Sequence, residues 1–191
     1  NSFLGGEDNV AEVIQSGGNG NSLVSQQSSN NEAYVEQIGT GGFSEVFQGD
    51  LTSPQGSDNF ADVTQTGLNR SFVGQGNGSR NSTTVVQVND TAGPANVSRV
   101  SQGDFALGND NTAAVVSQDG SSNESFITQS DTLGLGGFNS ADLSQTGDDN
   151  FSQITQNGTL NDASVTQTGD DNSSTVNQTG SGNTATVTQG S

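Results

Sequence analysis

Apolar and polar residues alternate along most of this chain in seven-residue units of the form Asn-x-small-x-Val-x-Gln, in which Ile or Leu can replace Val. Fifteen such units can be placed, and they contain 15 of the 18 glutamines. A period of two is typical of a β-strand with one buried face, so we expect positions one, three, five and seven to face inward. Among the members of the apolar fifth position are Val13, Val35, Val63, Val165 and Val187.

An Asn and a Gln bracket the units six residues apart, and both are present in 13 of the 15 units. A buried amide without a partner costs about 1–3 kcal/mol, so we expect each amide to bond to its equivalents in a ladder. Residues that merely flank turns would not keep this spacing. In the second unit, Asn21–Gln27, we expect Leu23 to supply the apolar group because Ser25 holds the fifth position. The predicted core ladder includes Asn9, Gln15, Asn31, Gln37, Asn59, Gln65, Asn139, Gln145, Asn161, Gln167, Asn183 and Gln189.

The small third position alternates between Ala and Ser in successive units, as in Ala163, Ser174 and Ala185. Two alternating strand types predict two sheets, one for each type, with two units in every coil. We therefore predict an all-β protein with a two-sheet β-solenoid, in which about 15 short strands form about 7.5 coils of about 22 residues with parallel, in-register stacking.

The repeats span residues 9–189 and follow an N-terminal segment, residues 1–8. The shortest connectors have four residues rich in Gly, Asn and Asp, which suits sharp turns between the sheets. Longer insertions are predicted at residues 49–58, 88–95, 103–111 and 130–138.

The composition excludes several classes of protein. The chain has 3 Lys+Arg against 21 Asp+Glu, a net charge of -18, and neither His nor Cys. It therefore has no disulfide framework, zinc cluster or histidine-dependent catalytic triad, and nucleic acid is an unsuitable partner because phosphates need a basic surface. No apolar run reaches the roughly 18–20 residues of a transmembrane helix. We interpret the start at Asn1 as a processed mature chain or a fragment, with any signal peptide already removed.

The last two units carry a family resemblance. Gln178, Gly180, Asn183, Ala185 and Gln189, preceded by Ser173, closely follow the curlin repeat of curli major subunits, written S-x5-Q-x-G-x2-N-x-A-x3-Q. The resemblance extends over about residues 9–189 and implies a curlin-type β-arcade. It also implies a secreted structural subunit of an extracellular, cell-surface amyloid fibre that serves biofilm matrix, adhesion and surface colonisation. A nucleator subunit and an outer-membrane secretion pore are the implied partners, although the extra coils, the four insertions and the lack of Lys and His leave open which ones.

A solenoid has two open edges, and each edge is a template for a further strand. The last unit is regular up to Gln189 and the first follows only eight residues, so we expect head-to-tail polymerisation of this chain with itself. Because the first and last units are both of the Ala type, we also expect residues 1–4 to add a partial strand that preserves the alternation, with a disordered tail as the alternative. The predicted polymer interface comprises Ser2, Leu4, Asn9, Ala11, Val13, Gln15, Asn172, Ser174, Val176, Gln178, Asn183, Ala185, Val187 and Gln189.

Two further features have both a structural and a functional interpretation. The acidic pairs Asp148, Asp149 and Asp170, Asp171 recur at one place in the coil, where they could bind Ca²⁺ or simply supply solvated charge. Aromatic residues fall at outward positions, which indicates either ordinary surface packing or lateral association of filaments. These aromatic residues are Tyr34, Phe43, Phe47, Phe60, Phe72, Phe126 and Phe151.

An alternative function is a soluble β-solenoid binding module, ice-binding or adhesin-like, because outward Thr residues cluster near the C-terminus at Thr184, Thr186 and Thr188. The outward threonines do not persist along the chain, which weakens this alternative. A polysaccharide-cleaving enzyme would need carboxylates in a groove, whereas the paired Asp fall on turns. We expect no enzymatic activity and no cofactor.

Overall fold

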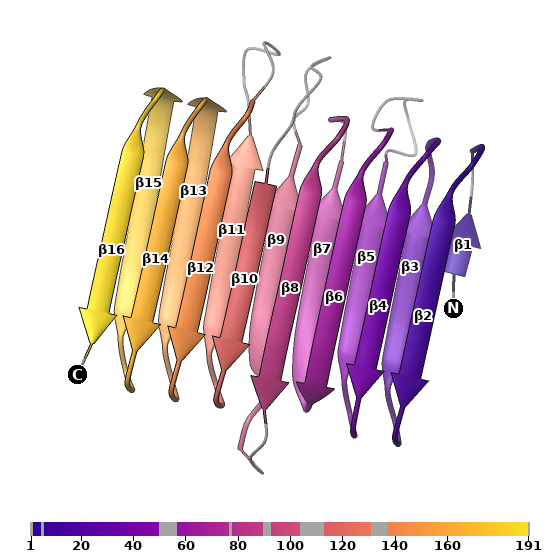
Figure 1. Ribbon diagram of the computed structural model, residues 1–191, viewed down its shortest axis with the longest axis horizontal. Helices are drawn as coiled ribbons and strands as arrows, with labels where there is room; N and C mark the ends of the chain where they lie inside the picture. The colour runs from indigo at the N-terminus through magenta and orange to yellow at the C-terminus, as the bar shows by residue number, and fades with distance from the viewer. Residues whose placement is uncertain are drawn as a thin grey trace.

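The fold is a stack of parallel β-strands in two sheets, as Figure 1 shows for the computed structural model. The structure describes residues 2–4, 6–49, 57–76, 78–89, 93–103, 113–130 and 137–190. Thr112 and most of the four predicted insertions lie outside this part of the chain. The strands are β1 (Ser2–Leu4), β2 (Val10–Ser16), β3 (Asn21–Gln26), β4 (Glu32–Ile38), β5 (Phe43–Gln48), β6 (Phe60–Gly67), β7 (Asn69–Gln75), β8 (Ser82–Asn89), β9 (Asn96–Gln102), β10 (Ala113–Asp119), β11 (Glu124–Ser130), β12 (Ser140–Thr146), β13 (Phe151–Thr159), β14 (Asp162–Thr168), β15 (Ser173–Ser181) and β16 (Thr184–Gly190).

Successive strands alternate between the two eight-stranded sheets. The Ala sheet has the order β16-β14-β12-β10-β8-β6-β4-β2, and the Ser sheet has the order β1-β3-β5-β7-β9-β11-β13-β15. We name them after the small residue that prevails at the third position of their units. The strands of the two sheets run in opposite directions, as the arrows in Figure 1 show. The predicted two-sheet solenoid is confirmed.

Equivalent residues pair along each sheet. Between β12 and β14, Ala141 is level with Ala163, Leu143 with Val165 and Gln145 with Gln167, and the other pairs of strands repeat this register. In a parallel stack each core position therefore becomes a continuous column of like side chains. The predicted parallel, in-register stacking is confirmed.

The register predicted for the second unit is wrong by one residue. In β3, Ser22, Val24 and Gln26 pair with the Ser, Val and Gln of β5, so Gln26 and not Gln27 enters the amide column. Gly20 takes the place predicted for Asn21. A Cβ at Gly20 would point toward the glutamine column and lie 3.1 Å from Gln37 Oε1. This register buries Val24 and Ser22 together, whereas the predicted one would have buried Ser25 in the apolar column. Leu23 consequently points outward and is only half-buried.

The core is a thin strip of small side chains between the sheets. Val35, Val63 and Val165 are fully or almost fully buried, while Val13 and Val187 on the two end strands are only partly buried. Alanines of one sheet, with Thr83 as the exception, and serines of the other fill the described third positions, which lets the sheets approach closely. At the N-terminal end, β1 pairs with β3 of the Ser sheet and places Ser2 level with Val24 and Leu4 level with Gln26.

Sharp arcs join the sheets, and in most of the described arcs the residue before the amide position has a positive φ, with Leu68 and Ala95 as exceptions. Asp149 and Asp171 have φ angles of 56° and 59° at this place, and Gly182 has 72°. The arcs also stack closely, because a Cβ at Gly147 would collide with the carbonyl oxygen of Gly169 in the next coil. Glycine is needed there both for its φ of 109° and for this close approach.

Candidate assembly interface

The glutamines of the Ala sheet form one continuous hydrogen-bonded column. Nε2 of Gln15 donates to Oε1 of Gln37 at 2.6 Å, and Nε2 of Gln167 donates to Oε1 of Gln189 at 2.8 Å. Every step between them has the same direction, so each amide donates toward the C-terminal end of the stack. The column consists of Gln15, Gln37, Gln65, Gln87, Gln118, Gln145, Gln167 and Gln189.

The same glutamine amides also join the two sheets. Nε2 of Gln167 donates to the carbonyl oxygen of Phe151 at 3.0 Å, and Nε2 of Gln189 donates to that of Ser173 at 2.9 Å. These carbonyls belong to the first residues of Ser-sheet strands. From Gln37 to Gln189, each glutamine of the column therefore donates to a backbone carbonyl of the opposite sheet.

The asparagine columns have the opposite polarity. Oδ1 of Asn161 accepts hydrogen bonds from the backbone N of Asn183 at 3.2 Å and from its Nδ2 at 2.8 Å. Asn161 donates in the same way to Asn139, while Asn59 donates to Asn31 and Asn31 donates to Asn9. Asparagine amides thus donate toward the N-terminal end, whereas glutamine amides donate toward the C-terminal end.

The Ser sheet has its own columns, from Gln26 to Gln178 and from Asn69 to Asn172. Its glutamine column begins with a defect, because Oε1 of Gln26 is buried and has no hydrogen-bond partner among the described residues. The residue level with Gln26 in β1 is Leu4, which has no side-chain donor. The column therefore stops where a leucine replaces a glutamine.

Comparison with known proteins now adds a family to this geometry. A family model described as curlin associated repeat matches residues 6–39 and 159–190. The chain contains curlin associated repeats. The matched residues contain β2 to β4 and β14 to β16, so the repeat is found at both ends of the stack. No curated protein and no solved structure was found to match the chain. Within the described residues, no helix is long and apolar enough to cross a membrane.

The end strands of the stack leave their core side chains partly uncovered. In β4 and β14 the inward residues are buried, but in β2 Ala11 and Val13 are only partly buried, and in β16 the same is true of Ala185 and Val187. In β15, which lies at the same end as β16, Ser174, Val176 and Gln178 are 7%, 5% and 6% exposed. An interior strand is covered by a neighbour on each side, whereas β2 and β16 have a neighbour on one side. The apolar side chains on their other side can therefore still be covered by a further strand.

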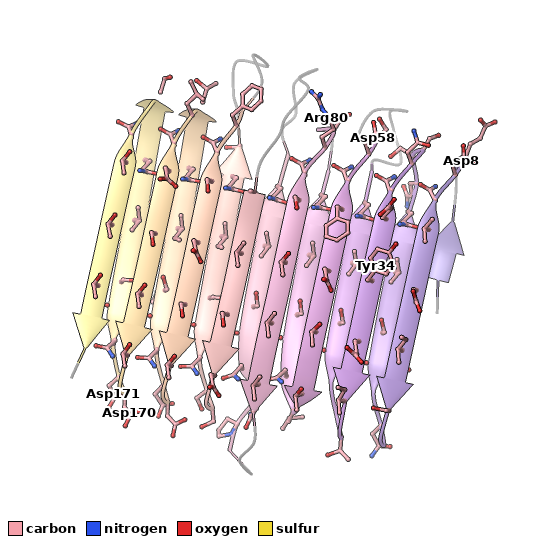
Figure 2. The ribbon with its side chains drawn as sticks, viewed as in Figure 1. Asp8, Tyr34, Asp58, Arg80, Asp170 and Asp171 are labelled. Carbon is pink, nitrogen blue, oxygen red and sulfur yellow. The ribbon has the colours of Figure 1, made fainter. Side chains whose placement is uncertain are left out.

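Asp170 and Asp171 lie at one edge of the stack, opposite to Asp8, Asp58 and Arg80 (Figure 2). Asp170 Oδ1 accepts a hydrogen bond from the backbone N of Asp148 at 2.9 Å, and Asp148 Oδ1 accepts from the backbone N of Ser121 at 2.8 Å. Asp149 and Asp171 hold the positive-φ position. No group of three or more potential metal-ligating residues is found in the described part of the chain, and Ca²⁺ binding stays a prediction.

The outward aromatic residues form pairs on both faces. Tyr34 and Phe60 lie on the Ala sheet with ring centroids 6.0 Å apart. On the Ser sheet, Phe43 pairs with Phe72 at 5.5 Å, and a second pair, Phe126 and Phe151, follows at 5.9 Å. Each pair joins strands that are neighbours in a sheet, so the rings cover the surface of the stack.

Proposed function

We propose that this curlin-repeat protein is a structural subunit of an extracellular curli-like fibre that grows head-to-tail, with β2 of one copy added to β16 of another. The observation that carries the proposal is the matched polarity of the two amide columns at the ends of the stack. Curlin associated repeats at both ends support a structural subunit instead of an enzyme.

Strand β16 of one copy and strand β2 of the next complement each other without rearrangement. Continuing the glutamine column lets Gln189 donate to Oε1 of Gln15 in the next copy. Continuing the asparagine column lets Asn9 of that copy donate to Oδ1 of Asn183. The apolar residues meet in the same register, with Ala11 on Ala185 and Val13 on Val187. Such a junction repeats the interior of the subunit and leaves the two edges of the polymer open.

The Ser sheet continues through the short strand β1. The register of β1 on β3 would place Ser2 of the incoming copy level with Val176 and Leu4 level with Gln178. A copy that begins with β1 and ends with β16 has an even number of strands, so the alternation of sheets is kept across the junction. Asn172 and Ser174 complete the receiving strand of the Ser sheet.

Two neighbouring residues of β16 test the interface. Val187 faces the core and Thr186 faces outward, and both lie on the last strand. We expect Val187→Asp to slow seeded fibre growth at least about tenfold, because a carboxylate would enter a dry apolar column, while the monomer keeps its β-sheet circular dichroism. Thr186→Asp adds the same charge on the outer face and should grow fibres at the original rate. Equal growth by both variants, or a chain that stays monomeric for days at high concentration, would contradict the proposal.

The cellular context of the fibre follows from the same proposal. Biofilm matrix, adhesion and surface colonisation are the roles we propose, with a nucleator subunit and an outer-membrane secretion pore as partners. Deleting the gene from its host should remove surface fibres seen by electron microscopy and reduce attachment to surfaces. Normal fibres after deletion would refute this assignment.

A further inference from the structure

The outer faces of the two sheets differ in charge. Every charged residue on the described strands of the Ala sheet is acidic: Glu12, Glu32, Glu36, Asp62, Asp119, Asp142 and Asp162. The described Ser-sheet strands carry Arg70 and Arg99 together with Glu45 and Glu124, and so have no net charge. A chain with a net charge of -18 repels its copies at most surfaces, and the Ser sheet is the face where this repulsion is weakest.

Aromatic rings and arginines form one band on the Ser sheet. The guanidinium carbon of Arg99 lies 5.2 Å from the ring centroid of Phe72, which in turn packs on Phe43. Arg70 and Arg99 are both exposed, and Phe47 beside them is 44% exposed. This band on β5, β7 and β9 presents two cations and three rings to the outside.

An acidic hollow lies on the Ala sheet, around Tyr34 in Figure 2. Its volume is about 240 Å³, and Glu12, Glu36 and Asp62 line it together with Ile14 and Tyr34. Partial burial and the nearby Glu36 raise the pKa of Asp62, so an added cation would be favourable there. Ile14, which lines the hollow, is 49% exposed, and Val10 on the same strand is 44% exposed.

The band and the hollow match in spacing. Arg70 and Arg99 lie on β7 and β9, which are neighbours in the Ser sheet, and Glu36 and Asp62 lie on β4 and β6, which are neighbours in the Ala sheet. Across the sheet, the members of each pair are therefore one strand spacing apart, about 4.8 Å, and along the strands they are two positions apart. Because the two sheets run in opposite directions, the second position of a Ser-sheet unit is level with the sixth of an Ala-sheet unit. The hydrogen bond from Gln178, at position seven, to Asn183 O, at position one, reflects this arrangement.

We propose that fibres of this protein associate laterally, with the same polarity, through the Ser-sheet face of one fibre on the Ala-sheet face of the next, with β7 opposite β4 and β9 opposite β6. This inference rests on the proposed function. A single placement of one fibre relative to the other then brings both charge pairs together: Arg70 meets Glu36, and Arg99 meets Asp62. The contact is heterologous, so it can repeat and build sheets or bundles of fibres.

The remaining residues fit this register with one exception. Phe72 lies opposite Tyr34, and β5 opposite β2 brings Phe43 to Ile14 and Phe47 to Val10. The exception is Glu45, which meets Glu12. Moving the faces by one strand in either direction separates both arginines from Glu36 and Asp62, so the stated register is the one that charge favours.

Charge reversal tests the contact in fibres of the full chain at about 0.15 M salt, where the Debye length of about 8 Å screens the general repulsion. Arg99→Asp should lower the fraction of bundled fibres in electron micrographs at least about tenfold and leave single fibres. The double variant Arg99→Asp with Asp62→Arg should restore bundling. Arg80→Asp, the same charge change on an arc, should have no effect, and Glu45→Gln should increase bundling.

Three results would overturn the proposal: bundling unaffected by Arg99→Asp, an equal loss with Arg80→Asp, or no restoration by the double reversal. Fibres of the unaltered chain that stay single would also overturn it and would point to another occupant of the two faces. The same images show whether single fibres form at all. Absence of single fibres would refute the proposed function itself, so the two failures are distinguishable.

Discussion

At the scale of single residues, stability depends on whether each buried polar group has a partner. Gln145 accepts a hydrogen bond from Gln118 and donates to Gln167 and to the carbonyl of Glu124, at 2.8, 2.9 and 3.1 Å. The serines at the third position of the Ser sheet differ, because within the described part of the chain the buried Oγ atoms of Ser44, Ser71, Ser98 and Ser125 have no hydrogen-bond partner. At these positions serine supplies the small volume that the closely packed sheets require, and its hydroxyl contributes no hydrogen bond.

Replacing such a serine by alanine should therefore stabilise the subunit. We expect Ser71→Ala to raise the free energy of unfolding by about 1 kcal/mol, since it removes a buried group without a partner and keeps nearly the same volume. Ser174→Ala is the matched control, because Ser174 Oγ donates to Ser152 Oγ at 3.0 Å, and it should lower stability by a similar amount. Denaturant unfolding of the monomer would measure both. A destabilising Ser71→Ala would contradict this account.

A second residue-scale prediction concerns pH. Burial, with a contribution from Glu36, raises the pKa of Asp62 in the folded state. The folded protein then holds this proton more tightly than the unfolded chain, so stability falls as pH rises from the unfolded to the folded pKa and is lowest above it. Asp62→Asn should stabilise the monomer at pH 7, and the gain should vanish below the titration range of an unfolded aspartate. Asp142→Asn, on the same row of the sheet, is the control, and an equal gain from it at pH 7 would show that general charge is the cause.

At the scale of strands and arcs, most of the described arcs have a left-handed residue before the amide position, although some sequences suit it poorly. Leu160 adopts a φ of 57° there and is 61% exposed, whereas Asn30 adopts 58° at the equivalent place. A left-handed conformation costs an L-residue about 1–2 kcal/mol, and Asn tolerates it better than Leu. The fold therefore imposes this geometry even where the local sequence opposes it.

Exchanging the residue types between these two arcs should have opposite effects. We expect Leu160→Asn to increase the free energy of unfolding by about 0.5–1 kcal/mol and Asn30→Leu to decrease it similarly, because the strain moves with the leucine. Thermal and denaturant unfolding of the two variants would measure this. Two changes of the same sign would show that side-chain contacts, and not backbone strain, decide the outcome.

The sequence predicted the strands and the two sheets because alternation and a fixed amide spacing leave few other structures. It failed in the second unit, where Gln26 and Gln27 are adjacent and either can end a unit. The choice depends on whether Val24 or Ser25 enters the core, so the apolar position was a better guide than the Asn-to-Gln distance. The polarity of the columns was not predictable, since an amide can donate in either direction until backbone geometry selects one. The unpartnered serine hydroxyls also needed coordinates, because a serine and an alanine column give the same pattern.

At the scale of the whole molecule, the subunit is a modular stack in which one coil can replace another. The arcs Thr146-Gly147-Asp148-Asp149 and Thr168-Gly169-Asp170-Asp171 have the same sequence and lie 22 residues apart. Removing residues 150–171 deletes β13 and β14 and leads the first of these arcs directly into Asn172. Then β15 would meet β11, with Val176 on Ile127, and β16 would meet β12, with Val187 on Leu143. All columns stay continuous, since each strand keeps its own sheet.

Removing residues 161–171 instead deletes a single strand, β14, and sends β15 and β16 each to the opposite sheet. The last coil then no longer matches β1 and β2 of an incoming copy. We expect the 22-residue deletion to form fibres whose axial length per subunit is shorter by one coil, about 4.8 Å. The 11-residue deletion should slow seeded growth at least about tenfold, because amides at the junction would lack partners. Cryo-electron microscopy gives the axial repeat, and a seeded growth assay gives the rates. If fibres of both deletion variants grow equally fast, alternation between the sheets does not select the next copy. Recognition at the ends then depends on the side chains of the end strands alone.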